Sequence, residues 1–311
     1  MLPVGKYINL FTDFGFKRIF GQEANKDILI DFLNQVLPKD YHIQDLQFSK
    51  HEHLGQTKEN RRAIFDLYCI TGEGEHFIVE LQKARQDFFQ DRSLYYASFP
   101  IQEMAPKGKI DGKVWDYELK PVFTVGILNF VFKDHETSED LYHHIQLKDQ
   151  DCQVFYDKLH FIYLELPKFT KTLAECENHY EKWLWVFKNL PALEEVPASL
   201  QKTIFAKVFK LSEVAKFNRK EQVAYRQSLK YLWDLANVVN TAKREGRAEG
   251  RAEGEIIGHE KGKKEGEETG VQLVLQIIQL YNSEKTVAEI AKIVEKPMVF
   301  VQKILRDARL M

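Results

Sequence analysis

Two short stretches decide the fold: AIFDLYCI at residues 63–70 and HFIVELQK at residues 76–83. Both are rich in the β-branched and aromatic residues that favour strands. The segment between them, Thr-Gly-Glu-Gly-Glu at residues 71–75, has the composition of a turn. The sequence therefore predicts a β-hairpin.

A hairpin symmetrical about residue 73 pairs three positions of one strand with three of the other: Asp66 with Glu80, Ile64 with Gln82, and Tyr68 with Ile78. Side chains alternate between the two faces of a strand. One face then carries an apolar stripe made of Phe65, Leu67, Cys69, Phe77, Val79 and Leu81. The other face carries three polar residues among Ile64, Tyr68 and Ile78, namely Asp66, Glu80 and Gln82.

Two carboxylates directly opposite each other repel, so a positive charge is expected to offset them. Magnesium prefers one or two carboxylates together with phosphate oxygens of a substrate, and it would supply that charge. The spacing alone also fits a second interpretation, in which Asp66 and Glu80 are two solvated acids on an exposed strand face.

The rest of the chain predicts alternating helices and strands. Apolar residues at helical spacing predict helices at residues 26–37 and 87–104. Strands are predicted at residues 43–48, 121–132 and 159–166, and the run PVFTVGILNFVF at 121–132 is apolar enough for a strand buried on both faces. Residues 173–242 are mostly helical in pattern.

Several of these segments occur in an order that resembles a known family. They are DFGFKRIFG near the start, IFDLYC, FIVELQKA, QDRSLYYAS with Arg92, PVFTVGILNF and LHFIYLEL. In this order they resemble the recombination-promoting nucleases, described as PD-(D/E)xK transposases, over roughly residues 8–240. The resemblance implies an α/β fold, with a mixed central sheet flanked by helices and a helical C-terminal region.

The resemblance also implies a function and a site. The chain would be an Mg²⁺-dependent DNA endonuclease, linked to recombination, mobile elements or defence, in which Asp66 and Glu80 hold the metal. Gln82 stands where the family motif usually has lysine; it can orient a water molecule but carries no charge. Accessory candidates are Asp13 or Glu52 as a further acid, and Lys17 or Arg92 as phosphate contacts. Asp13 is equally suited to cap the first helix. Lys17 and Arg92 are equally suited to form ion pairs with surface acids.

Composition sets limits on these expectations. A net charge of −2 gives no global basic signature, which weighs against a purely electrostatic DNA binder. The three cysteines, Cys69, Cys152 and Cys176, lack the close spacing of a zinc site. The pairs His51-x-His53 and His143-His144 are interpreted as incidental loop residues rather than metal ligands. The chain has no signal peptide pattern and no long apolar segment, so we expect a cytoplasmic protein without a membrane span.

Glycine recurs at every fourth position from 246 to 270, among mostly charged residues. Each glycine costs a lone helix about 1 kcal/mol relative to alanine, which favours a flexible linker. A glycine ridge also lets two helices approach closely, and we favour a helix that pairs with a second copy to form a homodimer. If so, deleting residues 244–270 should lower the mass measured by light scattering.

The tail, residues 271–311, has a second possible function. Thr286 and Glu289 match a helix capping box, and Lys296-Pro297 separates two short amphipathic helices. This spacing resembles a helix-turn-helix, with Lys303, Arg306 and Arg309 on or near the second helix. A helical hairpin used for packing is the other interpretation.

The expected organisation is therefore a nuclease-like domain with a helical extension at residues 1–240, the glycine repeat at 241–270 and the helical tail at 271–311. The alternative to an enzyme is a catalytically weakened member that binds DNA or protein through its tail. The deciding feature is whether Asp66 and Glu80 converge.

Overall fold

In a computed structural model, the chain is described at residues 5–49, 52–53, 63–104, 109–110, 113–114 and 117–311. It divides into two compact units, Met1–Asn237 and Val238–Met311. Within these described ranges, no helix combines the length and the apolar character that crossing a membrane requires.

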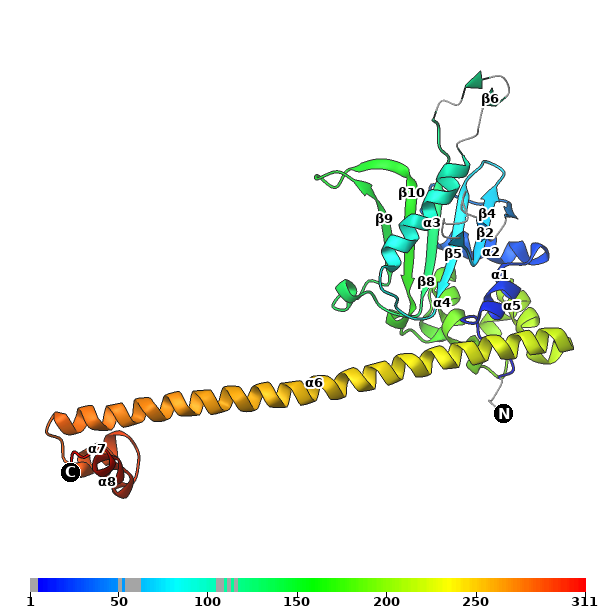
Figure 1. Ribbon diagram of the computed structural model, residues 1–311. Helices are drawn as coiled ribbons and strands as arrows, with labels where there is room; N and C mark the ends of the chain where they lie inside the picture. Colours follow the sequence, from blue (N-terminus) through cyan, green and yellow to red (C-terminus); the bar gives the residue numbers. More distant parts are fainter. Residues whose placement is uncertain (1–4, 50–51, 54–62, 105–108, 111–112, 115–116) are drawn as a thin grey trace. The chain divides into compact units, whose positions relative to one another are not determined.

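The first unit is built on a six-stranded sheet with the strand order β1-β4-β5-β8-β10-β9 (Figure 1). Its strands are β1 (Leu46–Phe48), β4 (Leu67–Thr71), β5 (His76–Gln82), β8 (Val122–Leu128), β9 (Tyr142–Lys148) and β10 (Val154–Glu165). The strands β5, β8 and β10 run parallel, and the other neighbours pair antiparallel. Two short pairs lie outside this sheet: β2 (Glu52–His53) with β3 (Ala63–Ile64), and β6 (Lys109–Ile110) with β7 (Lys113–Val114).

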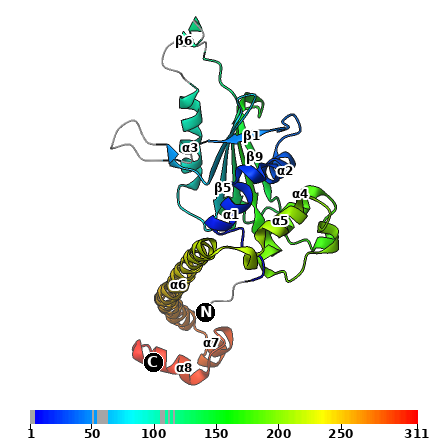
Figure 2. The same ribbon diagram turned by 90° about the vertical axis from the view of Figure 1, so that its right-hand side faces the viewer.

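Helices cover both faces of the sheet, as predicted (Figure 2). The crossover helix α3 (Phe89–Glu103) joins β5 to β8 and packs on one face, where Tyr96 and Phe99 contact Phe65, Tyr68 and Ile78. The other face carries the main core and the helices α1 (Asp13–Phe20), α2 (Lys26–Val36), α4 (His179–Asn189) and α5 (Ile204–Ser212). The mixed sheet between helical layers confirms the predicted fold class.

The hairpin has the predicted register, since Tyr68 pairs with Ile78. Two details were wrong. Ile64 does not lie opposite Gln82, because it belongs to β3 and pairs with Glu52. Phe65 does not join the apolar stripe of Leu67 and Val79; it packs with Tyr68 on the α3 face. The reason is a bend at Asp66 that ends the strand and interrupts the alternation of side chains.

Two further expectations near the site were wrong. Asp13 does not cap the first helix; Thr12 is the N-cap, and its side chain accepts a hydrogen bond from the Gly15 N–H. His143 and His144 are not in a loop, because both lie within β9. The sheet order, which the local sequence pattern does not reveal, brings this strand alongside β10.

The long helix α6 (Arg219–Asn282) includes the glycine repeat, whose residues are helical. In the second unit, α7 (Val287–Ile293) and α8 (Met298–Asp307) follow it. Thr286 and Glu289 form the predicted capping box. A separate small core holds this unit together, made of Ile277, Ile290, Ala291, Val294, Val301 and Leu305.

Candidate functional site

The predicted acids meet at the carboxyl end of β5. Glu80 and Gln82 face the same side of the sheet as Ile78, which is covered by α3. Their side chains are buried, each with 7% exposure, which excludes the interpretation of two solvated acids. Asp66 is half-buried and lies just before β4 begins.

Two hydrogen bonds join the backbone and side chain of Asp66 to β5. The Asp66 N–H donates to Glu80 Oε1 at 3.2 Å, and the Leu81 N–H donates to Asp66 Oδ2 at 2.8 Å. These side-chain acceptors occupy the place of the regular ladder bonds, which stop at the pair Leu67–Val79. The bend at Asp66 thus brings its carboxylate to β5 and fixes both acids in one small region.

Gln82 completes a short polar chain. Its Nε2 donates to Glu80 Oε2 at 3.1 Å, so each oxygen of the Glu80 carboxylate accepts one hydrogen bond. The amide therefore orients Glu80 and adds no charge. A carboxylate has about four lone-pair positions, so Glu80 keeps the capacity to bind a cation.

The surroundings of Asp66 and Glu80 disfavour the ionised form of both acids. Burial, and then the charge of Asp66, raise the pKa of Glu80 from 4.5 to about 8. Burial also raises the pKa of Asp66, against the hydrogen bond from Leu81 and the charge of Lys17. Neighbouring acids with raised pKa values are a frequent property of functional sites. The donor set, two carboxylates with a neighbouring amide, fits a hard divalent cation such as Mg²⁺.

Three of the four accessory candidates lie near this pair. The charge of Arg92, on α3, lowers the pKa of Glu80. Lys17 and Asp13, on α1, act on the pKa of Asp66, and they form an ion pair of 2.8 Å with each other. Glu52 is the fourth candidate; its backbone in β2 pairs with Ile64, and its side chain lies outside the described part of the structure.

A cavity of about 860 Å³ opens beside α1, and its lining includes Asp13, Lys17, Arg18, Lys83 and Tyr231. The alternation of β5 predicts that Lys83 points away from Gln82, and it does lie on the α1 side with Asp13 and Lys17. Its Nζ lies 5.1 Å from the centre of the Tyr231 ring. Burial lowers the pKa of Lys83, whereas the charges of Asp13 and Asp66 raise it.

Strand alternation predicts the direction of Lys83 but not its neighbours, because these come from two distant elements. The chain places α1 and the first part of α6 beside the end of β5, and only that packing joins Lys83 to Lys17 and Tyr231 in one cavity. The only local signal was the Gln-Lys order at residues 82 and 83.

Comparison with known proteins identifies a protein family that matches most of the chain. A family model described as a PD-(D/E)XK nuclease family transposase matches residues 10–242, which include the whole sheet and every residue of the cluster above. No curated protein and no solved structure matches the chain.

Proposed function

The chain belongs to the PD-(D/E)XK nuclease family of transposases, and from that membership we propose that it is an Mg²⁺-dependent endonuclease that hydrolyses phosphodiester bonds in DNA. The observation that carries this proposal is a pair of hydrogen bonds at the end of β5, from the Asp66 N–H to Glu80 Oε1 and from the Leu81 N–H to Asp66 Oδ2. These bonds hold the half-buried carboxylate of Asp66 near the buried carboxylate of Glu80, where a divalent cation would relieve their repulsion.

In the proposed mechanism, Asp66 and Glu80 would hold the metal. When bound, Mg²⁺ would supply positive charge to the scissile phosphate and would lower the pKa of a nearby water molecule. Gln82 orients the Glu80 carboxylate through its Nε2 donor and leaves its amide oxygen to position the attacking water. Because burial raises the pKa of Glu80 to about 8, this acid must lose a proton before it can bind the metal.

Positive groups on both sides of the pair would contact the DNA backbone. Arg92 lies on the α3 side, and Lys17 and Lys83 line the cavity on the α1 side. These three cations would provide local phosphate contacts that the net charge of −2 does not reveal. Recombination or mobile-element biology is the process in which we expect this cleavage to act.

Cleavage of supercoiled plasmid tests the proposal. We expect nicking or linearisation by the full chain with Mg²⁺, none in EDTA, and at least about a hundredfold loss in Asp66→Ala and in Glu80→Ala. The control Glu73→Ala removes an exposed acid from the turn between β4 and β5 and should cleave normally. Undiminished cleavage by both site variants would refute the assignment of Asp66 and Glu80 as metal ligands. An inactive wild type would refute the proposal that the chain is a nuclease.

The tail supports a second candidate function, DNA or protein binding independent of cleavage. On α8, Val301 and Leu305 are buried in the small core, whereas Lys303 and Arg306 are exposed. The cations are therefore free to contact phosphates, as on the second helix of a helix-turn-helix. Anisotropy of labelled DNA in EDTA should show at least tenfold weaker binding by the full chain carrying Lys303→Glu and Arg306→Glu. Unchanged affinity would leave α8 as a packing or protein-binding helix.

A further inference from the structure

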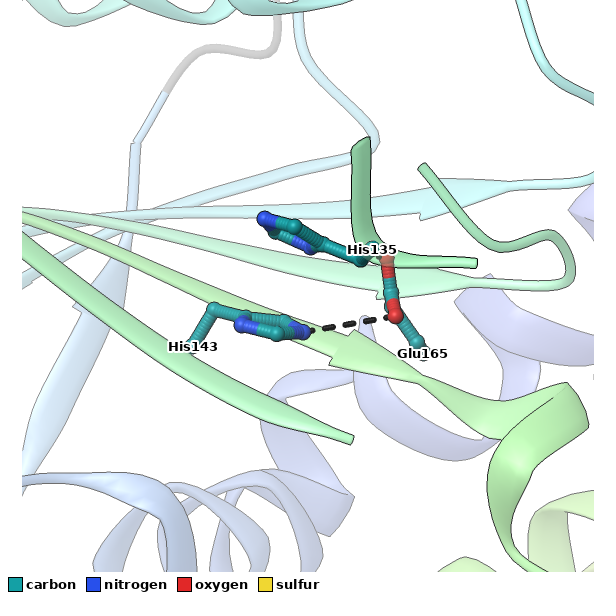
Figure 3. A group of neighbouring side chains, drawn as sticks. All are labelled: His135, His143 and Glu165. Carbon is teal, nitrogen blue, oxygen red and sulfur yellow. Dashed lines mark hydrogen bonds and ion pairs between the residues drawn. The ribbon is translucent and has the colours of Figure 1, made fainter. Parts of the chain in front are cut away.

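Three potential metal ligands meet at the carboxyl end of β10, away from the acid pair. Glu165 is the last residue of β10, His143 lies on β9, and His135 ends the short helical turn Lys133–His135 (Figure 3). One ligand atom from each lies within 4.8 Å of the others. His143 was expected to be incidental, but chain connections far apart in sequence place it beside a second imidazole and a carboxylate.

The spacing of these atoms suits a small transition-metal ion. His135 Nδ1 is 3.2 Å from Glu165 Oε1, and His143 Nε2 is 3.3 Å from Glu165 Oε2. The two imidazole rings stack with their centres 4.1 Å apart. A tetrahedral zinc ion with bonds of about 2.0–2.1 Å separates neighbouring donors by roughly 3.4 Å. Small side-chain rotations would therefore bring both rings and one carboxylate oxygen onto a single ion.

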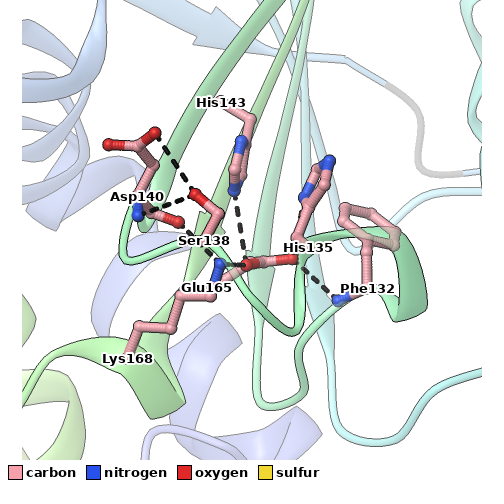
Figure 4. Close-up of polar contacts among 7 residues, drawn as sticks. All are labelled: Phe132, His135, Ser138, Asp140, His143, Glu165 and Lys168. Carbon is pink, nitrogen blue, oxygen red and sulfur yellow. Dashed lines mark hydrogen bonds and ion pairs between the residues drawn. The ribbon is translucent and has the colours of Figure 1, made fainter.

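Glu165 is an unusual acid to bury. Its side chain has 0% exposure, and the Phe132 N–H donates to its Oε1 at 2.7 Å. Lys168 Nζ lies 2.6 Å from Oε2 and also donates to the Asp140 carbonyl at 2.8 Å (Figure 4). The same oxygen of Glu165 lies 3.3 Å from His143 Nε2, so the ammonium group and the imidazole both face this buried carboxylate. Charged groups buried in a protein are paired with an opposite charge or coordinate a metal, so this carboxylate requires a cation beside it.

We propose that His135, His143 and Glu165 form a binding site for a divalent transition metal of the zinc class, with Lys168 holding the place of the cation when the metal is absent. Two imidazoles and a carboxylate select zinc-like ions over Mg²⁺, which prefers oxygen ligands. Lys168 neutralises Glu165 in the free protein, and on metal binding it keeps its second partner, the Asp140 carbonyl. The side chain of His135 is 32% exposed, which gives the ion a route from solvent.

The site is distinct from the acid pair. Glu165 pairs with Leu128 of β8, and Leu128 pairs with Gln82 of β5, so two strand spacings separate Glu165 from Gln82. At about 4.8 Å per spacing, the separation is roughly 10 Å. Metals that share one substrate phosphate lie about 3.5–4 Å apart. The proposed ion would therefore act as a structural link that ties the β8–β9 connection and β9 to β10, whether or not the chain cuts DNA.

Zinc titration of the full chain against a chromophoric chelator tests this site. The titrations use chain that carries Asp66→Asn and Glu80→Gln, so that the acid pair takes up no zinc and failure of the proposed nuclease cannot affect the result. We expect one zinc ion per chain and a rise in melting temperature on binding. His143→Ala should weaken binding by at least about a hundredfold, because even residues that only support metal ligands are worth 10–100-fold.

Two further variants separate a metal site from a simple ionic brace. His144→Ala removes the neighbouring β9 imidazole, which bonds to His160 instead, and should leave zinc affinity unchanged. Lys168→Met removes the competing ammonium group and should tighten zinc binding about tenfold or more. Absence of stoichiometric zinc binding would overturn the proposal, as would equal affinity in His143→Ala or unchanged or weaker affinity in Lys168→Met.

Discussion

Replacing Glu80 with glutamine isolates the cost of burying this acid without a cation. Burial and the Asp66 charge raise the pKa of Glu80 from 4.5 to about 8, so at pH 7 the native chain keeps a proton that the unfolded chain releases. A raised native pKa means that stability falls as pH rises from 4.5 to 8. At about 1.4 kcal/mol per pKa unit, the wild type loses roughly 3 kcal/mol of unfolding free energy between pH 4.5 and pH 7.

Glutamine has the shape of the protonated acid and does not titrate. We therefore expect metal-free Glu80→Gln to exceed the wild type by roughly 3 kcal/mol at pH 7 and to equal it near pH 4. Mg²⁺ should stabilise the wild type, because binding the metal offsets the repulsion between the acids, and should leave the variant unchanged.

Urea denaturation in EDTA, followed by tryptophan fluorescence, measures this difference. All four tryptophans precede residue 238, so the signal reports the first unit. Glu73→Gln, in the exposed turn, is the matched control and should follow the wild type at every pH. A stability difference between Glu80→Gln and wild type that stays constant from pH 4 to pH 8 would refute the reasoning, and so would Mg²⁺ stabilisation of the variant.

Substitutions at Gln82, at Gly126 and in the glycine repeat test three other features of the chain. Gln82→Lys places an ammonium group beside Glu80 Oε2 and should lower the pKa of Glu80. The pH at which DNA cleavage is half-maximal should therefore fall, and a shift of this pH to a higher value would contradict the prediction. Gly126 pairs with Glu80 across β5 and β8, and Gly126→Ala puts a Cβ 2.8 Å from Tyr163 Cδ1. This substitution should lower the free energy of unfolding, measured by urea denaturation, by about 1–3 kcal/mol. Gly72→Ala, with no described atom within 4 Å, should change it little. Gly254→Ala with Gly258→Ala should lower the dimer fraction in light scattering if the glycine ridge pairs two copies; unchanged mass with a more stable helix would exclude that pairing.

The hairpin could be predicted from the sequence because its information is local. Strand alternation and a turn centred on residue 73 were sufficient to pair Tyr68 with Ile78. The same rule failed at Ile64 and Phe65, because the Asp66 side chain takes over a backbone hydrogen bond of the ladder. Alternation assumes an unbroken strand, and a polar side chain that replaces a ladder bond breaks it without altering the apolar pattern.

Burial of Glu80 and the grouping of the charged residues could not be predicted in this way. The face of Glu80 is buried only because α3 crosses it, which depends on the position of β8 beside β5. Likewise, His135, His143 and Glu165 come together only through the order β8-β10-β9 in the sheet. Long-range packing decides these contacts, and a single sequence shows its local components without their arrangement.

The central claim, that Asp66 and Glu80 hold one divalent ion between them, is tested most directly by counting bound Mn²⁺ with electron paramagnetic resonance. The full chain should carry His143→Ala in this experiment, so that the histidine cluster does not contribute. We predict one bound Mn²⁺ per chain, lost when either Asp66→Asn or Glu80→Gln is added. Mn²⁺ bound with unchanged affinity after both substitutions would contradict the claim.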